Sequence, residues 1–180
     1  MSQLKVNSIV PTGGLSTGAF GGIIQVIPAF TNATTINTTN TFADITGLSV
    51  TITPSSTSSK FLIMTCMTLG GSEAGTGIYL NLVRNSTPSA QNLSSSSHPA
   101  TTILGFGAPS NTYSYSYFHL DETSLSDLSD ITYKYQIRGN AVGQVTVNQR
   151  SIANDLYSTA NLIVCEVSGW VLYLIILLKV

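Results

Sequence analysis

Few side chains in this sequence have the chemistry of a catalytic or metal-binding group. The two histidines are His98, which follows a run of serines, and His119, which precedes Asp121 and Glu122. A histidine beside a serine or cysteine can activate a nucleophile, and a histidine with carboxylates can bind a metal ion. Serines are abundant here, no nucleophile-elbow motif surrounds any of them, and carboxylates at a strand end usually form a solvated turn. We therefore expect no catalytic residue and no metal site.

The acidic residues of segment 119–130 could also supply oxygen ligands to calcium. They lack the alternate spacing and the glycine of an EF-hand loop, so a polar loop is the better interpretation. A glycosidase needs two carboxylates that face each other across a cleft, and the chain has only eight acidic residues. Segment 13–22 contains glycines but no phosphate-binding loop motif. We expect a protein that is not an enzyme and uses no cofactor.

The low charge of the chain limits the partners that it can have. Only 8% of its 180 residues are charged, against about 25% in an average protein, and the net charge is −1. Seven lysines and arginines without a basic cluster cannot neutralise a row of phosphates, which excludes a nucleic-acid partner. A net charge near zero also weakens the repulsion between copies, which favours an assembled state.

Strands must position these side chains, because apolar and polar residues alternate and helical periodicity is almost absent. Segment 60–69 is almost continuously apolar, as expected for a strand covered on both faces, and segment 21–30 is predicted as a strand closed by Pro28. Nine strands in all are expected, in segments 21–30, 41–56, 60–69, 76–88, 101–106, 112–120, 131–139, 143–151 and 158–169. This spacing predicts an all-β antiparallel sandwich or barrel. An eight-stranded jelly roll fits best, because several connections are too long for tight hairpins.

Three tyrosines share one face of the strand predicted at 112–120: Tyr113, Tyr115 and Tyr117. Exposed aromatic rings on a strand could stack on sugar rings of a glycan. The alternative, which we favour, is that they pack in the core or at a subunit contact with their hydroxyls on polar partners. Cys66 and Cys165 lie in apolar runs and are expected to be buried free thiols.

The composition divides the chain into an extended arm at 1–20, a β-sandwich at 21–169 and an apolar tail at 170–180. The tail is much shorter than the roughly 20 apolar residues that cross a bilayer, so we expect no membrane span. A segment this apolar needs a cover. We expect it to pack within an oligomer through Trp170, Leu172, Leu174, Ile176 and Leu178.

Seven stretches follow one another in a distinctive order: LKVNSIVP (4–11), GGIIQVI (21–27), ITGLSVTITPSSTSSKFLIM (45–64), LNLVRNST (80–87), YKYQIRG (133–139), VNQRS (147–151) and LIVCEV (162–167). In this order they resemble a family of small tail-fibre-like virion proteins of bacteriophages, especially phages of cyanobacteria. The resemblance implies a trimeric structural protein of the virion. It also implies a jelly-roll-like head similar to the trimers of C1q and tumour necrosis factor.

The resemblance further assigns roles to parts of the chain. The segment that docks onto the virion would comprise Leu4, Lys5, Val6, Asn7, Ile9 and Pro11. The implied partners are two further copies, other virion proteins and host surface polysaccharide, and the implied location is the virion, assembled in the host cytoplasm. The tail from Trp170 looks like an addition to the family's pattern. Because no heptads for a shaft are present, a capsid-decorating protein, head fibre or adaptor with no ligand of its own remains the alternative.

Overall fold

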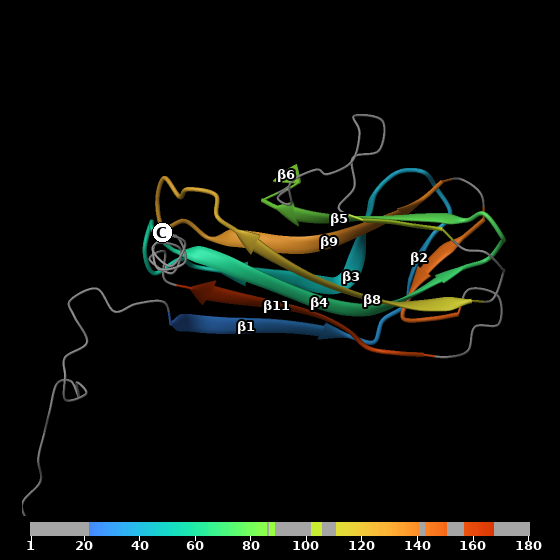
Figure 1. Cartoon of the computed structure of the whole chain (residues 1–180), viewed down its shortest axis with the longest axis horizontal. Coiled ribbons are helices and arrows are strands. Elements are labelled where there is room, and N and C mark those ends of the chain that lie inside the picture. Colours follow the sequence, from blue (N-terminus) through green and yellow to red (C-terminus); the bar gives the residue numbers. More distant parts are fainter. Residues whose placement is uncertain are drawn as a thin grey trace, which may run out of the picture.

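The computed structural model describes residues 22–85, 111–140, 143–150 and 157–167, together with the backbone of 87–88 and 102–105. These residues form eleven strands and no helix (Figure 1). The strands are β1 (Ile23–Thr31), β2 (Thr35–Asn37), β3 (Ala43–Ile52), β4 (Lys60–Gly71), β5 (Gly77–Arg84), β6 (Thr87–Pro88), β7 (Thr102–Gly105), β8 (Thr112–Asp121), β9 (Ile131–Gly139), β10 (Val145–Val147) and β11 (Ala160–Val167).

The strands form two antiparallel sheets that pack against each other (Figure 1). The six-stranded sheet has the order β1-β11-β4-β10-β2, with β8 paired to the other edge of β4. The five-stranded sheet has the order β3-β9-β5-β6, with β7 also paired to β5. The prediction of an all-β antiparallel architecture is therefore confirmed.

Side chains that point inward from both sheets form one core. In β9, Tyr133, Tyr135 and Ile137 are fully buried, while the residues between them are partly exposed. The ring of Tyr133 meets the ring of Phe61 of β4 across the core, with 5.9 Å between the ring centres. Fully burying such a side chain stabilises the fold by about 1.5–3 kcal/mol. A slip of one residue would expose the whole inward row, so burial fixes which side of each strand faces inward.

The strands predicted at 60–69 and 112–120 correspond to β4 and β8 within two residues, whereas other predicted bounds differ from the structure. The strand predicted at 131–139 is β9 with the same bounds. The prediction that Pro28 closes the first strand was wrong, because β1 continues to Thr31 and Pro28 is paired with Ile163. β1 lies at a sheet edge, and there a proline can occupy a strand with its missing N–H on the unpaired side. The strand predicted at 76–88 is divided into β5 and the two-residue β6. β2 was not predicted, and its three residues are too few to show an alternating pattern.

Candidate functional site

The outward side of the six-stranded sheet carries a continuous set of apolar side chains. Strands β1, β11, β4 and β8 lie next to one another, and residues paired across them point to the same side of the sheet. One row across the sheet consists of Val26, Cys165, Leu62 and Leu120, and the next of Pro28, Ile163, Met64 and Phe118. We call these eight residues the apolar face, together with Phe30 and Cys66 of the adjoining row, whose other two members, Asn161 and Ser116, are polar.

Several members of the apolar face are open to solvent. The exposed fraction is 68% for Phe118, 64% for Phe30, 51% for Val26 and 40% for Leu120. Within the part of the chain that the structure describes, nothing covers these side chains. Contiguous exposed apolar surface on a soluble domain marks a contact site.

Strand β4 shows the same incomplete cover. The sequence predicts a strand covered on both faces, and its inward residues Phe61, Ile63 and Met67 are indeed buried. Its outward residues Leu62 and Met64 are only partly buried, and Cys66 is exposed. β4 therefore has the composition of a doubly covered strand, but the described residues cover one side alone.

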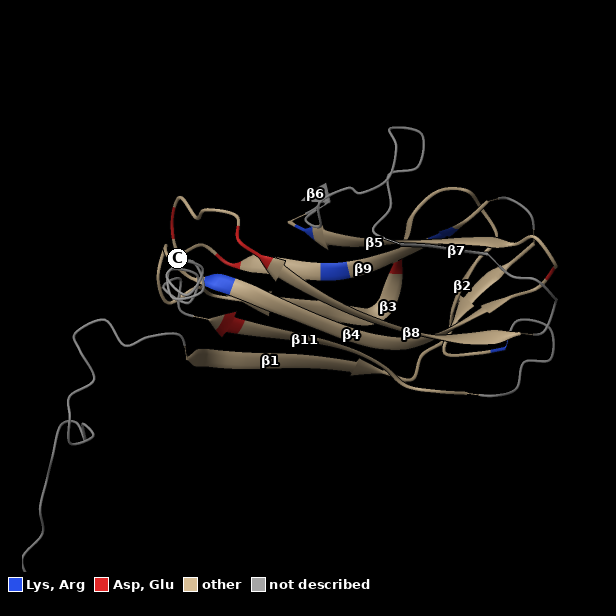
Figure 2. Cartoon of the chain, viewed as in Figure 1, with Lys and Arg blue, Asp and Glu red and all other residues tan. Residues whose placement is uncertain are grey.

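The outward side of the five-stranded sheet has the opposite chemistry. Lys134 Nζ of β9 donates to Asp44 Oδ2 of β3 at 2.7 Å, and Gln136 Nε2 donates to the other oxygen at 2.7 Å. The hydrogen bond from Lys134 holds the pKa of Asp44 below its ordinary value. Figure 2 shows charge along β9, whereas β1 carries no charged residue and those of β4, β8 and β11 lie near strand ends. The outward side of the five-stranded sheet therefore suits contact with water, and the apolar face of the six-stranded sheet suits contact with an apolar partner.

A buried glutamate fixes one edge of the apolar face. Glu166 of β11 is fully buried, and its Oε2 accepts a hydrogen bond from Gln25 Nε2 of β1 at 2.6 Å. Its Oε1 accepts from Ser55 N at 2.7 Å, Ser55 Oγ at 2.6 Å and Ser59 Oγ at 2.5 Å. Burial alone would raise the pKa of Glu166, but these donors outweigh it and hold the pKa below its ordinary value. The carboxylate thus joins β1, β11 and the turn between β3 and β4.

This network gives a structural role to the serine-rich stretch TPSSTSSK at 53–60, whose first residues were predicted as the end of the strand at 41–56. Sequence reasoning missed Glu166 as its partner. A signal was nevertheless present, since an acidic residue inside an apolar strand needs donors when buried, and serine hydroxyls can supply them.

A second buried carboxylate joins the two sheets. Asp121 at the end of β8 is 3% exposed, and its Oδ2 accepts a hydrogen bond from Tyr133 Oη of β9 at 2.6 Å. Thr123 donates to Oδ1 from its backbone N at 3.0 Å and its hydroxyl at 2.6 Å, and Arg84 Nε lies 3.6 Å from Oδ2. The expectation of a solvated turn was therefore wrong for Asp121. The other acidic residues of this segment are exposed: Glu122, Asp127 and Asp130.

The surroundings of His119 and Asp121 do not resemble a catalytic pair. His119 is partly buried, and burial lowers its pKa even though the charge of Asp121 opposes that shift. Both oxygens of Asp121 already accept hydrogen bonds inside the protein. The described residues contain no group of three or more His, Cys, Asp or Glu side chains that could hold a metal ion. Asp121 joins β8 to β9 of the other sheet, and the ring of His119 stacks on that of Tyr117 with 6.3 Å between the ring centres.

The predicted tyrosine row is only partly accessible. Tyr113 is 39% exposed, Tyr117 is half-buried, and Tyr115 is buried with its ring centre 6.5 Å from that of Tyr135. A role of these tyrosines in binding a glycan or a subunit stays a prediction. Both cysteines are free. The expectation of a buried thiol is confirmed for Cys165 and was wrong for Cys66, which lies on the open side of β4.

The remaining predicted sites, the docking segment 4–11 and the tail 170–180, lie outside the described residues. No protein-family model matches this sequence, and no curated protein matches it. Within the described ranges, no helix has the length and apolarity needed to cross a membrane. A functional proposal therefore depends on the chemistry of the two outer faces.

Proposed function

We propose that this chain is a structural protein of a bacteriophage virion, a trimeric tail fibre or fibre knob that attaches the particle to its host. The observation that carries the proposal is the apolar face. In the trimer, the apolar face of each copy packs against the other two copies, and the polar side of the five-stranded sheet faces the solvent. The virion context comes from the resemblance of the ordered stretches between residues 4 and 167.

The proposal includes a finer description of the fold, a jelly roll like that of the C1q and tumour-necrosis-factor trimers. The strand order supports it. Strands β3, β4 and β5 alternate between the two sheets along the chain, and β8, β9 and β11 do the same. A jelly roll is a two-sheet architecture of this kind, in which Greek-key connections carry the chain between the sheets.

Further copies of the chain are a better occupant of the apolar face than a charged partner. The face has no charged member that could select a partner by charge, and a net charge of −1 adds little repulsion between copies. The apolar face spans five residues along each strand, about 16 Å, and four strands about 4.8 Å apart, which gives roughly 310 Å² in projection. This is under half of the about 800 Å² that each partner buries in a stable interface, so the polar surface around the face supplies the larger share.

The mass of the protein in solution tests the assembly. A trimer of 19.0 kDa chains has a mass of about 57 kDa, which light scattering coupled to size-exclusion chromatography resolves from a monomer. Met64→Lys places a charge on the apolar face and should yield a folded monomer, whereas Gln136→Lys adds the same charge to the polar face and should leave the trimer intact. A wild-type chain that is monomeric at micromolar concentration would overturn the trimer and favour a capsid-decorating protein.

The location on the particle needs a separate test. Antibodies raised against the chain should label the distal end of fibres on purified particles, and an excess of the isolated protein should lower adsorption of the virus to its host. Labelling spread evenly over the capsid, with no effect on adsorption, would contradict a role in attachment.

A further inference from the structure

A bulge in β3 opens the outward side of the five-stranded sheet. Asp44 is paired with Gln136 and the ladder resumes only where Ser49 is paired with Lys134, so the four residues 45–48 face a single residue of β9. Gly47 makes this possible with a φ of +76°, and Thr46 N is held by a hydrogen bond from its N–H to Thr35 Oγ1 at 2.9 Å. A bulge of this kind bends its strand and can redirect side chains at a functional site.

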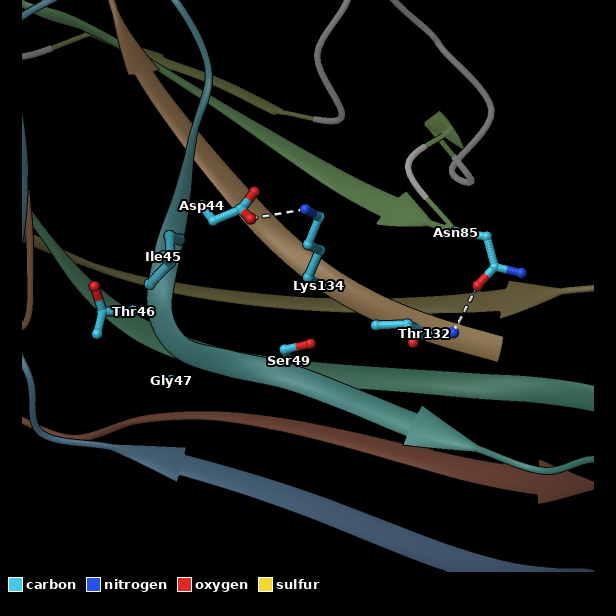
Figure 3. Close-up of a pocket in the computed structure, with 8 residues that line it drawn as sticks. All are labelled: Asp44, Ile45, Thr46, Gly47, Ser49, Asn85, Thr132 and Lys134. Atoms are coloured by element: carbon cyan, nitrogen blue, oxygen red, sulfur yellow. Dashed lines mark hydrogen bonds and ion pairs between the residues drawn. The ribbon is translucent and has the colours of Figure 1, made fainter. Parts of the chain in front are cut away.

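Beside the bulge lies an open groove of about 700 Å³. Figure 3 shows Asp44 and Lys134 on one side of it, with Thr132 and Asn85 further along and Ser49 below them. Ile45, Thr46 and Gly47 of the bulge complete the lining. Small-ligand sites occupy about 300–1,000 Å³, but most are lined by apolar side chains. This lining is polar apart from Ile45, so its ligand should be rich in hydrogen-bonding groups.

The charges in the groove cancel. Lys134 Nζ is 2.7 Å from Asp44 Oδ2, and every other lining residue is neutral. A phosphate or sulfate would meet one ammonium group that a carboxylate already neutralises, and a cation would meet a single carboxylate. The pair remains within reach of solvent, since the side chain of Asp44 is 54% exposed and that of Lys134 is 25% exposed.

From this geometry we propose that the groove binds a neutral saccharide, with Asp44 and Lys134 as its principal contacts. Each sugar hydroxyl both donates and accepts a hydrogen bond, whereas a carboxylate only accepts and an ammonium group only donates. Two neighbouring hydroxyls can therefore donate to Asp44 and accept from Lys134. The hydroxyl of Ser49 and the amide of Asn85 offer neutral contacts along the groove.

The position of the groove fits attachment, and in this respect the inference depends on the proposed function. The groove lies on the outward side of the five-stranded sheet, on the other side of the sandwich from the apolar face. An assembly that packs through the apolar face leaves every groove open to solvent. Weak binding at each of three grooves then adds up, because the second and third contacts are made within one particle.

A printed panel of neutral and acidic oligosaccharides, followed by titration calorimetry with the best neutral binder, tests the site. The wild type should bind neutral members. Asp44→Asn, which removes a charged acceptor, should weaken binding about tenfold or more. Ser49→Trp should block the groove, and the matched control Ser58→Trp, an exposed serine in the turn before β4, should bind as the wild type does.

Three outcomes would overturn the inference: a wild type that binds no panel member, one that binds acidic members alone, and a Ser49→Trp variant that binds as well as Ser58→Trp. Thermal melts of each variant distinguish a blocked groove from an unfolded chain. The mass of the same samples keeps the two proposals apart. A trimer without saccharide binding would refute the groove alone, and a monomer with groove-dependent binding would refute the trimer alone.

Discussion

Gln25 Nε2 and Glu166 Oε2 are joined by a hydrogen bond of 2.6 Å, although 141 positions separate the two residues in the chain. Gln25 also donates to the backbone oxygen of Thr53 at 2.8 Å. The bond holds the start of edge strand β1 against β11 and the serine-rich turn. Because β1 carries Val26 and Phe30 on its outward side, this polar network inside the sheet also sets the position of the apolar face.

Replacing the buried carboxylate should destabilise the fold. Glu166→Gln keeps the shape of the side chain but turns one oxygen into an NH₂ group that faces donors, so a buried donor loses its acceptor. We expect the free energy of unfolding to fall by about 2–3 kcal/mol in urea titrations. Glu122→Gln, at an exposed position, should change it by less than about 0.5 kcal/mol. Equal effects of the two variants would show that the network adds no stability.

The two buried carboxylates should make stability depend on pH. Burial opposes ionisation, yet their hydrogen bonds hold the pKa of Glu166 and of Asp121 below their ordinary values of 4.5 and 3.8. A carboxyl group with a lower pKa in the folded state stabilises the fold above its unfolded pKa, and this contribution is lost as the pH falls through the folded pKa. These two carboxyl groups should therefore leave the free energy of unfolding unchanged above about pH 6 and lower it between about pH 5 and 2. The lowered pKa of His119 adds a separate loss of stability as the pH falls through its ordinary value of 6.5.

The control for this pH dependence is Glu166→Gln, measured over the same range. Because the variant no longer titrates at this position, its free energy of unfolding should fall less steeply with acid than that of the wild type. Parallel curves for the two proteins would mean that other groups cause the acid sensitivity.

The sequence predicted the features that neighbouring residues encode. In β9 every second residue is buried, and this period of two was visible in the sequence, so the strand was predicted with the correct bounds. Pro28 was misread because a proline ends a central strand but not an edge strand, and the position of β1 in its sheet depends on pairing with β11. The partners of Glu166 and Asp121 were hidden for the same reason, since long-range packing brings them together.

The candidate face was visible in the sequence only in part. The apolar composition of β4 indicated two covered faces, but it could not indicate which strands extend the outer one. Phe118 lies beside Met64, and Ile163 lies on its other side, because the register of β8 and β11 places them there. The groove could not be predicted either, since the four-residue bulge in β3 has no sequence signal beyond Gly47.

The rate at which the Cys66 thiol reacts shows whether the apolar face is covered in solution. Its thiol lies on the open side of β4, whereas Cys165 is 2% exposed and burial raises the pKa of its thiol. In the folded monomer expected for Met64→Lys, one thiol per chain should react rapidly with Ellman's reagent. In the wild-type trimer and in Gln136→Lys, the same thiol should react at least tenfold more slowly. Rapid reaction in all three proteins would show that the apolar face stays open in solution.

Substitutions at two glycines can separate the cost of backbone strain from the cost of crowding at the bulge of β3. Gly47 and Gly75 both have positive φ values, +76° and +82°, so alanine should cost about 1–2 kcal/mol at either position. A Cβ at Gly75 would meet nothing within 4 Å, whereas one at Gly47 would lie 2.8 Å from Thr31 Oγ1. Gly47→Ala should therefore lower the free energy of unfolding by about 1–3 kcal/mol more than Gly75→Ala, as measured by urea titration. Equal losses of stability in the two variants would mean that the bulge rearranges around the added methyl group without an energetic penalty. A bulge that rearranges so easily could not hold the groove in a fixed shape.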